Sequence, residues 1–171
     1  MVDPMAVGEA LEIYDLLDSG GVRCWVMGGW GVDALLGVTT RSHKDLDLLV
    51  HRADIARCCA IARKAEFGRK LEWQESGPPV VNDVVYDSAF VDAHADGLEV
   101  DGHVVDIDDN GAVVQFHDGP WLLPHNTLSG KGTSVGRGLK CVSRSAELAM
   151  HSSSKLPDRH RDDVRLLQGF A

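Results

Sequence analysis

Hydrophobic and polar residues follow two different spacings along this chain, and the spacing changes from segment to segment. Apolar residues that recur every three to four positions indicate amphipathic helices. We expect helices at residues 5–18, 30–36, 53–65, 146–152 and from 157 onwards. Short apolar or alternating runs that end at glycine, proline or aspartate indicate strands. We expect strands at residues 22–27, 46–51, 67–73, 80–91, 99–107, 112–116 and 139–142.

Two further segments lack a clear period, and a glycine separates two of the strands. Residues 120–124 have a proline at each end and are expected to be irregular. Residues 129–138 contain four glycines and are expected to form a loop or a bent hairpin. Gly97 lies between two β-like runs and predicts a hairpin there.

The succession of helices and strands predicts an α+β protein with a mixed β-sheet flanked by helices. No repeat, linker or shift in composition divides the sequence, so residues 1–171 are expected to form a single domain. Within it, residues 1 to about 128 would form the catalytic core. Residues from about 129 to 171 would form a C-terminal extension with helices.

The composition narrows the class of partner. Lys and Arg number 17 against 26 Asp and Glu, which gives a net charge of −9. This charge opposes general nucleic-acid binding and mildly favours a cationic substrate. No apolar run approaches the roughly 18 residues of a membrane helix, and the first residues do not resemble a signal peptide. The four cysteines form no C-x-x-C pair, so we expect reduced thiols and a cytoplasmic location without a membrane partner.

The segment with the most chemistry joins a glycine turn to a pair of aspartates. Gly28 and Gly29 follow a predicted strand and precede a predicted helix, where backbone N–H groups can bind phosphate oxygens. Asp45 and Asp47 open the next strand. Side chains two residues apart on a strand point to the same face, so these carboxylates are expected to converge while Leu46 faces the core. Such an arrangement suits a Mg²⁺-dependent phosphoryl or nucleotidyl transferase.

Each half of this segment is weak evidence alone. A single D-x-D commonly marks a solvated strand start or a helix cap, and a single GG-x-G commonly marks an ordinary turn. The order of strand, glycine turn, helix, short loop and D-x-D strand, with the two halves about a dozen residues apart, is the more specific signal.

A third carboxylate is expected as a metal ligand, a general base or both, because the acceptor hydroxyl must lose its proton. The candidates in the middle of the chain are Asp83, Asp87, Asp92, Asp96, Asp101 and Asp106. Asp101 and His103 share one face of the predicted strand 99–107, and Val100 and Val104 share the other. His103 would orient Asp101, contact substrate or simply bond a backbone carbonyl. Asp92, in a second D-x-H segment, is the alternative base.

The loop before the D-x-D strand offers further candidates. Arg41 lies four residues before Asp45 and suits bidentate phosphate binding, with an ordinary surface arginine as the alternative. His43 would cap the loop or contact phosphate. Asp33, one turn into the helix after the glycines, would brace the loop through backbone hydrogen bonds.

These segments resemble the small antibiotic-resistance nucleotidyltransferases that act on lincosamides and aminoglycosides, within the DNA polymerase beta-like superfamily. The family pattern G-G-W-[AG]-[IV]-D, then T-R-x-H-x-D-[LI]-D, is met by residues 28–33 and 40–47. The pattern G-x-x-V-D-x-H is met by residues 97–103, and the glycine-rich tail of the family is similar to residues 129–142. Two departures stand out: Trp30 replaces the serine usual in the superfamily, and a family tyrosine is missing near the C-terminal end.

The resemblance implies the nucleotidyltransferase fold and a two-metal Mg²⁺ site held by Asp45, Asp47 and Asp101, with Asp101 as general base. The nucleotide-binding residues it implies are Gly28, Gly29, Arg41 and Lys131. It implies a nucleoside triphosphate, expected to be ATP, as co-substrate. A hydroxyl of a cationic small molecule, a lincosamide or an aminoglycoside, would be the acceptor.

Two other functions remain open at this point. A toxin-like nucleotidyltransferase that modifies tRNA or protein would need the same aspartates and a macromolecular groove, which the net charge of −9 disfavours for RNA. A catalytically inactive nucleotide-binding module would keep the fold without its chemistry. The sequence is compatible with a homo-oligomer and does not determine the oligomeric state.

Overall fold

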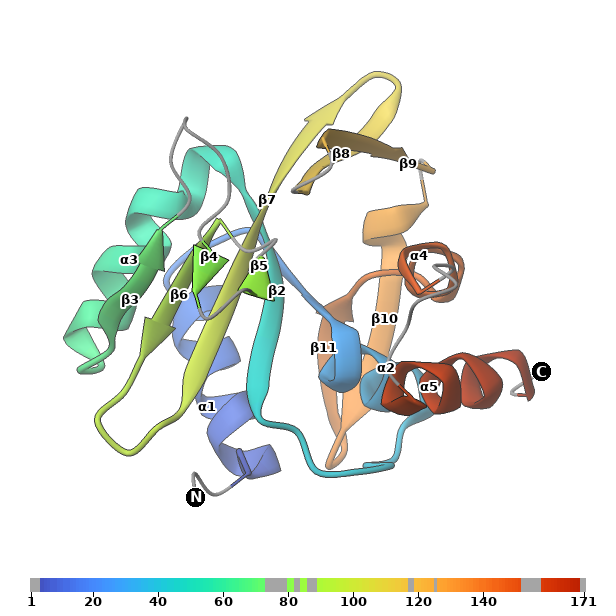
Figure 1. Ribbon diagram of the computed structural model, residues 1–171, viewed down its shortest axis with the longest axis horizontal. Coiled ribbons are helices and arrows are strands. Elements are labelled where there is room, and N and C mark those ends of the chain that lie inside the picture. Colours follow the sequence, from blue (N-terminus) through green and yellow to red (C-terminus); the bar gives the residue numbers. More distant parts are fainter. Residues whose placement is uncertain are drawn as a thin grey trace.

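The computed structural model describes residues 4–72, 80–81, 84–85, 89–116, 119–124, 126–151 and 158–169. Over these residues, helices pack on a mixed β-sheet (Figure 1), which confirms the predicted α+β class. The helices are α1 (Val7–Ser19), α2 (Gly28–Leu36), α3 (Ile55–Lys64), α4 (Arg144–Met150) and α5 (Asp158–Gly169). Short 3₁₀ turns lie at Arg52–Asp54 and Thr127–Ser129.

One large sheet contains most of the described strands, in the order β10-β11-β1-β2-β7-β6-β3. Its strands are β1 (Cys24–Met27), β2 (Asp45–His51), β3 (Gly68–Glu72), β6 (Phe90–Ala93), β7 (Glu99–Asp108), β8 (Gly111–Phe116), β9 (Gly119–Leu123), β10 (Gly130–Ser134) and β11 (Arg137–Cys141). The central pair β2 and β7 is parallel, and β1 and β6 run antiparallel to β2 and β7 respectively. The far end of β7 pairs with β8, and β8 with β9. The short strands β4 (Val80–Val81) and β5 (Val84–Val85) pair with each other.

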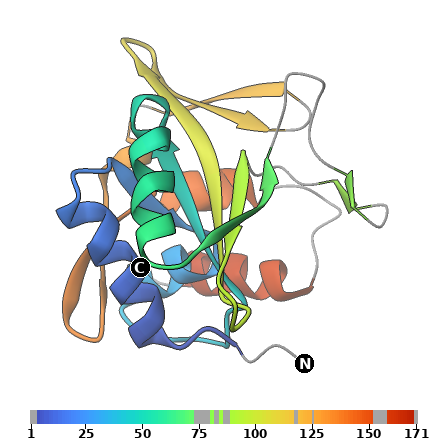
Figure 2. The ribbon, with the colours of Figure 1, turned by 90° about the vertical axis from the view of Figure 1, so that its left-hand side faces the viewer.

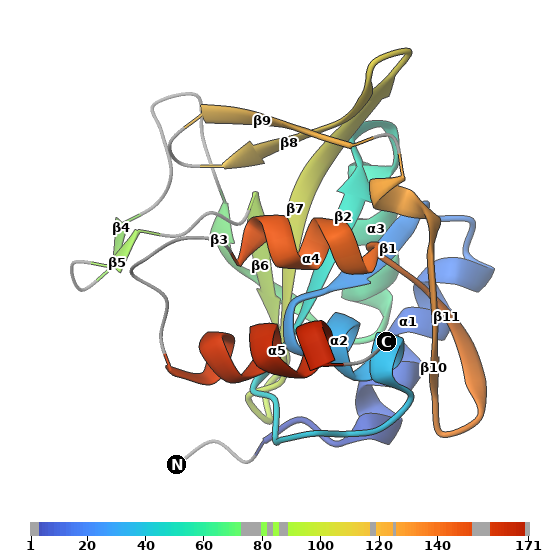
Figure 3. The same ribbon diagram turned by 90° about the vertical axis from the view of Figure 1, so that its right-hand side faces the viewer.

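The alternation along β2 decides which face of the sheet is apolar. Leu46, Leu48 and Val50 are buried in the cluster that also contains side chains of α1 and α3. Asp45 and Asp47 therefore point to the opposite face, on the side of α4. Figures 2 and 3 show this division, with α1 and α3 on one side of the sheet and α4 and α5 on the other.

Helix α2 begins two residues earlier than the sequence pattern predicts. Gly28 and Gly29 form its first turn, and Met27 is the N-cap. Gly28 has φ +63°, and Gly37 ends the helix in the left-handed conformation at φ +73°. Both positions favour glycine because a Cβ makes that backbone region costly.

The C-terminal half contains more sheet than expected. Residues 120–124 were expected to be irregular, but Gly119–Leu123 forms β9. Among the described strands β9 pairs with β8 alone and is therefore an edge strand, a position where proline is tolerated because one side of the strand has no ladder partner. The glycine-rich segment forms the β10–β11 hairpin, so the main sheet continues across the predicted boundary near residue 128.

Four predicted segments, 67–73, 80–91, 146–152 and the helix from 157 onwards, fall partly on residues outside the described ranges. The predicted hairpin at Gly97 is confirmed by the antiparallel pairing of β6 with β7. Among the described helices, none combines the length and apolarity that crossing a bilayer requires.

Candidate active site

The two central strands bring three carboxylates to one face of the sheet. Asp47 of β2 and Asp101 of β7 are register partners in the parallel pairing. Asp45 lies two residues before Asp47 on the same strand and therefore on the same face. All three side chains are half-buried. The predicted trio is thus gathered by pairing between segments more than 50 residues apart in sequence.

The environment of Asp101 suits proton transfer near neutral pH. Burial, and after it the carboxylates of Asp47 and Asp45, raise the pKa of Asp101 from 3.8 to about 7. A base whose pKa lies close to the working pH combines the ionised form with a useful affinity for the proton. The imidazole of His103 acts in the opposite direction and lowers the pKa of Asp101.

The carboxylate face fits a hard divalent cation in its chemistry. Within the described ranges, no three Asp, Glu, His or Cys side chains already close around a single point as a finished metal site. Asp45, Asp47 and Asp101 nonetheless supply oxygen ligands from one face, which is the ligand type that Mg²⁺ prefers. Like charges so placed repel one another, and after burial this repulsion is the next cause of the raised pKa of Asp101. A cation would relieve it.

The first turn of α2 packs directly against this face. A Cβ built on Gly28 would lie 2.5 Å from Oδ2 of Asp47, closer than any side chain tolerates. Met27, the residue before Gly28, is the register partner of Asp47 in the β1–β2 pairing. The N-terminus of α2, with its partial positive charge, therefore lies beside one of the carboxylates.

Asp33 and His43 lie inside the protein and brace the loop. Both are 3% exposed, and His43 Nε2 lies 2.6 Å from Oδ2 of Asp33. The other oxygen of Asp33 accepts hydrogen bonds from the Thr40 backbone N–H at 3.0 Å and the Thr40 hydroxyl at 2.6 Å. The bond from the Thr40 backbone N–H is of the kind expected of Asp33, and burial leaves His43 without an exposed surface for phosphate.

Arg41 has a partner that the sequence pattern does not predict. Its guanidinium donates to both carboxylate oxygens of Asp163 on α5, from Nη2 at 2.9 Å and from Nε at 3.3 Å. It also donates from Nη1 to Nδ1 of His43 at 3.0 Å. Hydrogen bonding to Asp163 is the main cause that raises the pKa of Arg41 above its ordinary value, so the side chain stays cationic.

The two remaining predicted residues, His103 and Lys131, lie in different parts of the sheet. His103 is buried on the carboxylate face of β7, with Nε2 3.8 Å from Oδ1 of Asp47. Lys131 is exposed on the edge strand β10, opposite Lys140. Strands β11 and β1 separate β10 from β2, which amounts to about 14 Å across the sheet at ordinary strand spacing. The structure does not bring Lys131 to the carboxylates.

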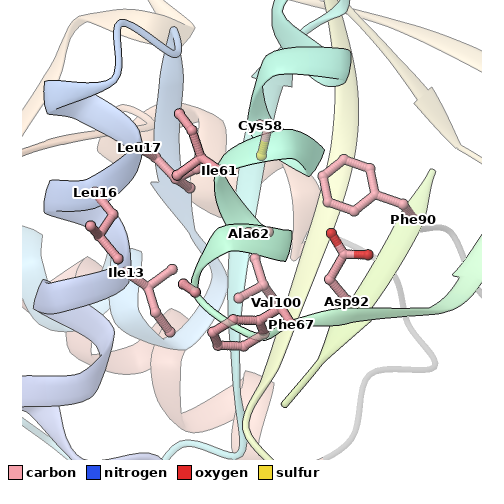
Figure 4. Close-up of a pocket in the computed structure, with 11 residues that line it drawn as sticks. Ile13, Leu16, Leu17, Cys58, Ile61, Ala62, Phe67, Phe90, Asp92 and Val100 are labelled. Carbon is pink, nitrogen blue, oxygen red and sulfur yellow. The ribbon is translucent and has the colours of Figure 1, made fainter.

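The alternative base Asp92 lies on the other face of the sheet. Its register partner is Val100, not Asp101. It is 4% exposed, pairs with Nε of Arg69 at 2.6 Å and lines a small apolar cavity of about 20 Å³ beside α1 and α3 (Figure 4). Asp92 is therefore separated from the site by the sheet itself.

Of the other middle carboxylates, the two that the structure describes have partners elsewhere. Asp83 and Asp87 lie outside the described ranges. Asp96 pairs with His94 in the β6–β7 turn, and Asp106 forms a bidentate pair with Arg52.

Glu147 of α4 is a buried acid near the site that the sequence pattern does not single out. It is fully buried, and its Oε1 would lie 2.5 Å from a Cβ on Gly31. Its Oε2 lies 3.4 Å from Nδ1 of His151. Burial raises the pKa of Glu147 well above its ordinary value, and the carboxylate of Asp47 adds to the rise, whereas the Gly28 backbone N–H lowers it. The sequence gives no indication that this glutamate is buried, because a single glutamate in a short helix is usually exposed.

The chain is similar to known resistance enzymes over almost its whole length. The sequence profile of a family described as aminoglycoside-2''-adenylyltransferase matches residues 9–167. A lincosamide resistance protein of Staphylococcus haemolyticus is 26% identical over 164 residues, which cover 95% of this chain and 94% of the relative.

Two solved structures have the same fold. The lincomycin-bound lincosamide antibiotic adenylyltransferase LnuA aligns with a TM-score of 0.81 and 20% identity, over 99% of this chain and 100% of LnuA. ANT(2'')-Ia in complex with adenylyl-2''-tobramycin aligns with a TM-score of 0.69 and 21% identity, over 92% of this chain and 84% of that one. These likenesses confirm the predicted nucleotidyltransferase fold.

Proposed function

The chain belongs to the aminoglycoside-2''-adenylyltransferase family, and from this premise we propose that it transfers a nucleotidyl group from a nucleoside triphosphate to a hydroxyl of a small antibiotic. Membership confirms the predicted enzyme class, an antibiotic-modifying nucleotidyltransferase. The nucleotide, the metal and the acceptor are our proposals: ATP, Mg²⁺, and a lincosamide or an aminoglycoside.

The observation that supports this function best is the pairing of Asp47 with Asp101 beside the first turn of α2. Asp45, Asp47 and Asp101 would hold Mg²⁺, with a two-metal arrangement expected. Bound there, the metal would supply Lewis-acid stabilisation of charge on the phosphates.

Asp101 would act as the general base. It takes the proton of the acceptor hydroxyl as that oxygen attacks the α-phosphorus, while the bond from the α-phosphorus to the bridging oxygen breaks and pyrophosphate leaves. Its pKa of about 7 supports this role, because the group is partly ionised at neutral pH and can still hold a proton. His103, buried on the same face of β7 as Asp101, would orient them.

The first turn of α2 would bind the phosphate chain. Backbone N–H groups at Gly28 and Gly29 lie at the positive end of the helix dipole. Arg41 would contribute a charge-assisted hydrogen bond to a phosphate oxygen. Lys131 is too far along the sheet to share this task.

The acceptor class follows from the relatives and from charge. The named relatives comprise a lincosamide resistance protein, the lincomycin-bound LnuA and a complex with adenylyl-tobramycin. A net charge of −9 attracts a cationic antibiotic and repels RNA. Because the reaction consumes a nucleoside triphosphate, a cytoplasmic location is part of the proposal.

A labelling experiment tests this function. The protein is incubated with Mg²⁺, each α-labelled nucleoside triphosphate in turn, and lincomycin, tobramycin, tRNA or the protein alone. We expect label on one of the antibiotics and none on tRNA or protein. Label on tRNA or protein would support the toxin-like function instead, and no label on any acceptor would support an inactive module.

A further inference from the structure

A buried ion pair ties the C-terminal helix to the loop before β2. Asp163 of α5 accepts two hydrogen bonds from Arg41, although the two residues are 122 positions apart. The Asp163 side chain is only 2% exposed, whereas that of Arg41 is 29% exposed. Burying a carboxylate is costly unless a hydrogen-bonded group of opposite charge accompanies it, and Arg41 is that partner of Asp163.

The opposite end of the guanidinium is held by a histidine of defined tautomer. Arginine has no acceptor, so Nδ1 of His43 must accept the hydrogen bond from Nη1 of Arg41 at 3.0 Å. The ring proton then lies on Nε2 and is donated to Oδ2 of Asp33 at 2.6 Å. The ring of Trp30 packs on His43 with centroids 4.3 Å apart. Arg41 is therefore clamped on two sides by buried groups.

The side chains of Arg41 and His43 lie against the first turn of α2. A Cβ on Gly29 would lie 2.2 Å from Nδ1 of His43 and 2.8 Å from Nη2 of Arg41. Glycine is required there because the guanidinium and the imidazole occupy the space of a side chain. The same Nη2 that bonds Asp163 thus lies against the turn expected to bind phosphate.

A count of donors shows what Arg41 has left to offer. Its five N–H groups meet four contacts in the described residues: two to Asp163, one to His43 and one to the Ser42 carbonyl at 3.3 Å. The remaining N–H belongs to Nη2. The positive charge of Arg41 is already paired with the carboxylate of Asp163. Arg41 therefore offers one directed N–H donor at Gly29 rather than an unpaired charge.

We propose that Asp163 is a positioning residue for the nucleotide, holding Arg41 against Gly29 so that its remaining Nη2–H meets a phosphate oxygen. This inference rests on the proposed function and extends it to α5, which no predicted site residue occupies. Loss of one charge-assisted hydrogen bond typically weakens binding on the order of 10-fold or more. The defect should appear in nucleotide affinity and spare the acceptor.

Calorimetric titration of the full chain with MgATP, without acceptor, measures this directly. The variants are Asp163→Asn, which removes the charge of the buried carboxylate, Arg41→Lys, which keeps the charge and removes the fork, and the double variant. Asp162→Asn is the matched control, because Asp162 is the adjacent exposed residue of α5 and pairs with Arg165 on the same helix. We expect about 10-fold weaker MgATP binding for each single variant, no further loss in the double variant, and no change in the control.

Steady-state kinetics separates positioning from mere folding. We expect the KM for nucleotide to rise in Asp163→Asn while the KM for acceptor and kcat at saturating nucleotide change much less. Unchanged MgATP affinity with a lower melting temperature would overturn the proposal, as would a rise confined to the acceptor KM. If Asp163→Asn fails to fold, unchanged MgATP affinity in Arg41→Lys overturns it equally. A wild-type chain that binds none of the four nucleoside triphosphates contradicts the proposed function itself.

Discussion

Asp101 of β7 lies beside Asp47 of β2 in a parallel pairing, and the carboxylate of Asp47 helps to raise the pKa of Asp101 to about 7. The sheet thus places a proton acceptor next to an expected metal ligand on the same face. On the opposite face, Asp92, the register partner of the preceding residue Val100, is paired with Arg69. The two faces give two aspartates of similar sequence context very different environments.

Replacing the base tests this assignment. Asp101→Asn is expected to lower kcat by about 10²- to 10⁴-fold, the usual contribution of general-base catalysis, and to weaken nucleotide binding far less. Asp92→Asn is the comparison: it should lower the melting temperature, because Arg69 loses a buried partner, and keep the turnover of the folded protein. Turnover measured for both variants decides, and an inactive Asp92→Asn beside an active Asp101→Asn would reverse our assignment.

Adding a methyl group at the glycine turn should disturb the carboxylates. Gly28→Ala places a Cβ 2.5 Å from Oδ2 of Asp47 at φ +63°, so Asp47 must move, and a displacement of about 1 Å can lower the rate on the order of 10²-fold. Gly136→Ala is the matched control, since Gly136 has φ +75° with no heavy atom within 4 Å of the built Cβ. Gly136→Ala therefore has the same unfavourable positive φ but no steric clash with a neighbouring side chain. Equal activity in the two variants would show that the contact with Asp47 is unimportant.

The metal should become harder to bind when one carboxylate is removed. Asp45→Asn keeps the shape of the side chain and loses an anionic ligand, so we expect the Mg²⁺ concentration for half-maximal rate to rise by about 10-fold or more. The rate at saturating Mg²⁺ should also fall, and EDTA should abolish wild-type activity. Asp96→Asn, at an exposed position, serves as the control. An Asp45→Asn variant with wild-type Mg²⁺ dependence would remove Asp45 from the metal site.

Stability should depend on pH through Glu147. Because burial raises the pKa of Glu147 well above its ordinary value, the folded state keeps a proton that the unfolded chain has released. The folded state then binds more protons in this range, so its stability falls as pH rises. Glu147→Gln cannot ionise, and we expect its gain in melting temperature over the wild type to grow as the pH rises above the ordinary carboxyl range. Glu12→Gln, on the exposed side of α1, controls for the lost charge, and a gain independent of pH would contradict this account.

Local pattern predicts the faces of strands well and long-range partners poorly. The alternation in residues 45–50 is enough to separate the carboxylates from the core, because strand periodicity acts on each residue locally. The pairing of β2 with β7 has no such signal, and Asp101 was singled out with the help of a family resemblance. Lys131 shows the limit of that help, since the sheet order places it away from the carboxylates.

The partners of Arg41 and the environment of Glu147 could not be predicted for the same physical reason. Asp163 meets Arg41 only after α5 packs on α2, 122 residues later in the chain. Glu147 resembles a solvated helical residue until α4 lies under the glycine turn. Pro120 was misleading in another way: it suggests an irregular segment, and only the edge position of β9 makes it compatible with a strand.

The central claim is that the carboxylate face performs nucleotidyl transfer, and the fate of two labels tests it most directly. The protein is incubated with Mg²⁺, lincomycin or tobramycin, and ATP labelled in parallel at the α- or the γ-phosphate, with Asp101→Asn alongside. We predict that the α-label moves to the antibiotic, that the γ-label leaves in pyrophosphate, and that Asp101→Asn transfers neither at a comparable rate. Transfer of the γ-label to the antibiotic, or undiminished α-label transfer by Asp101→Asn, would contradict the account.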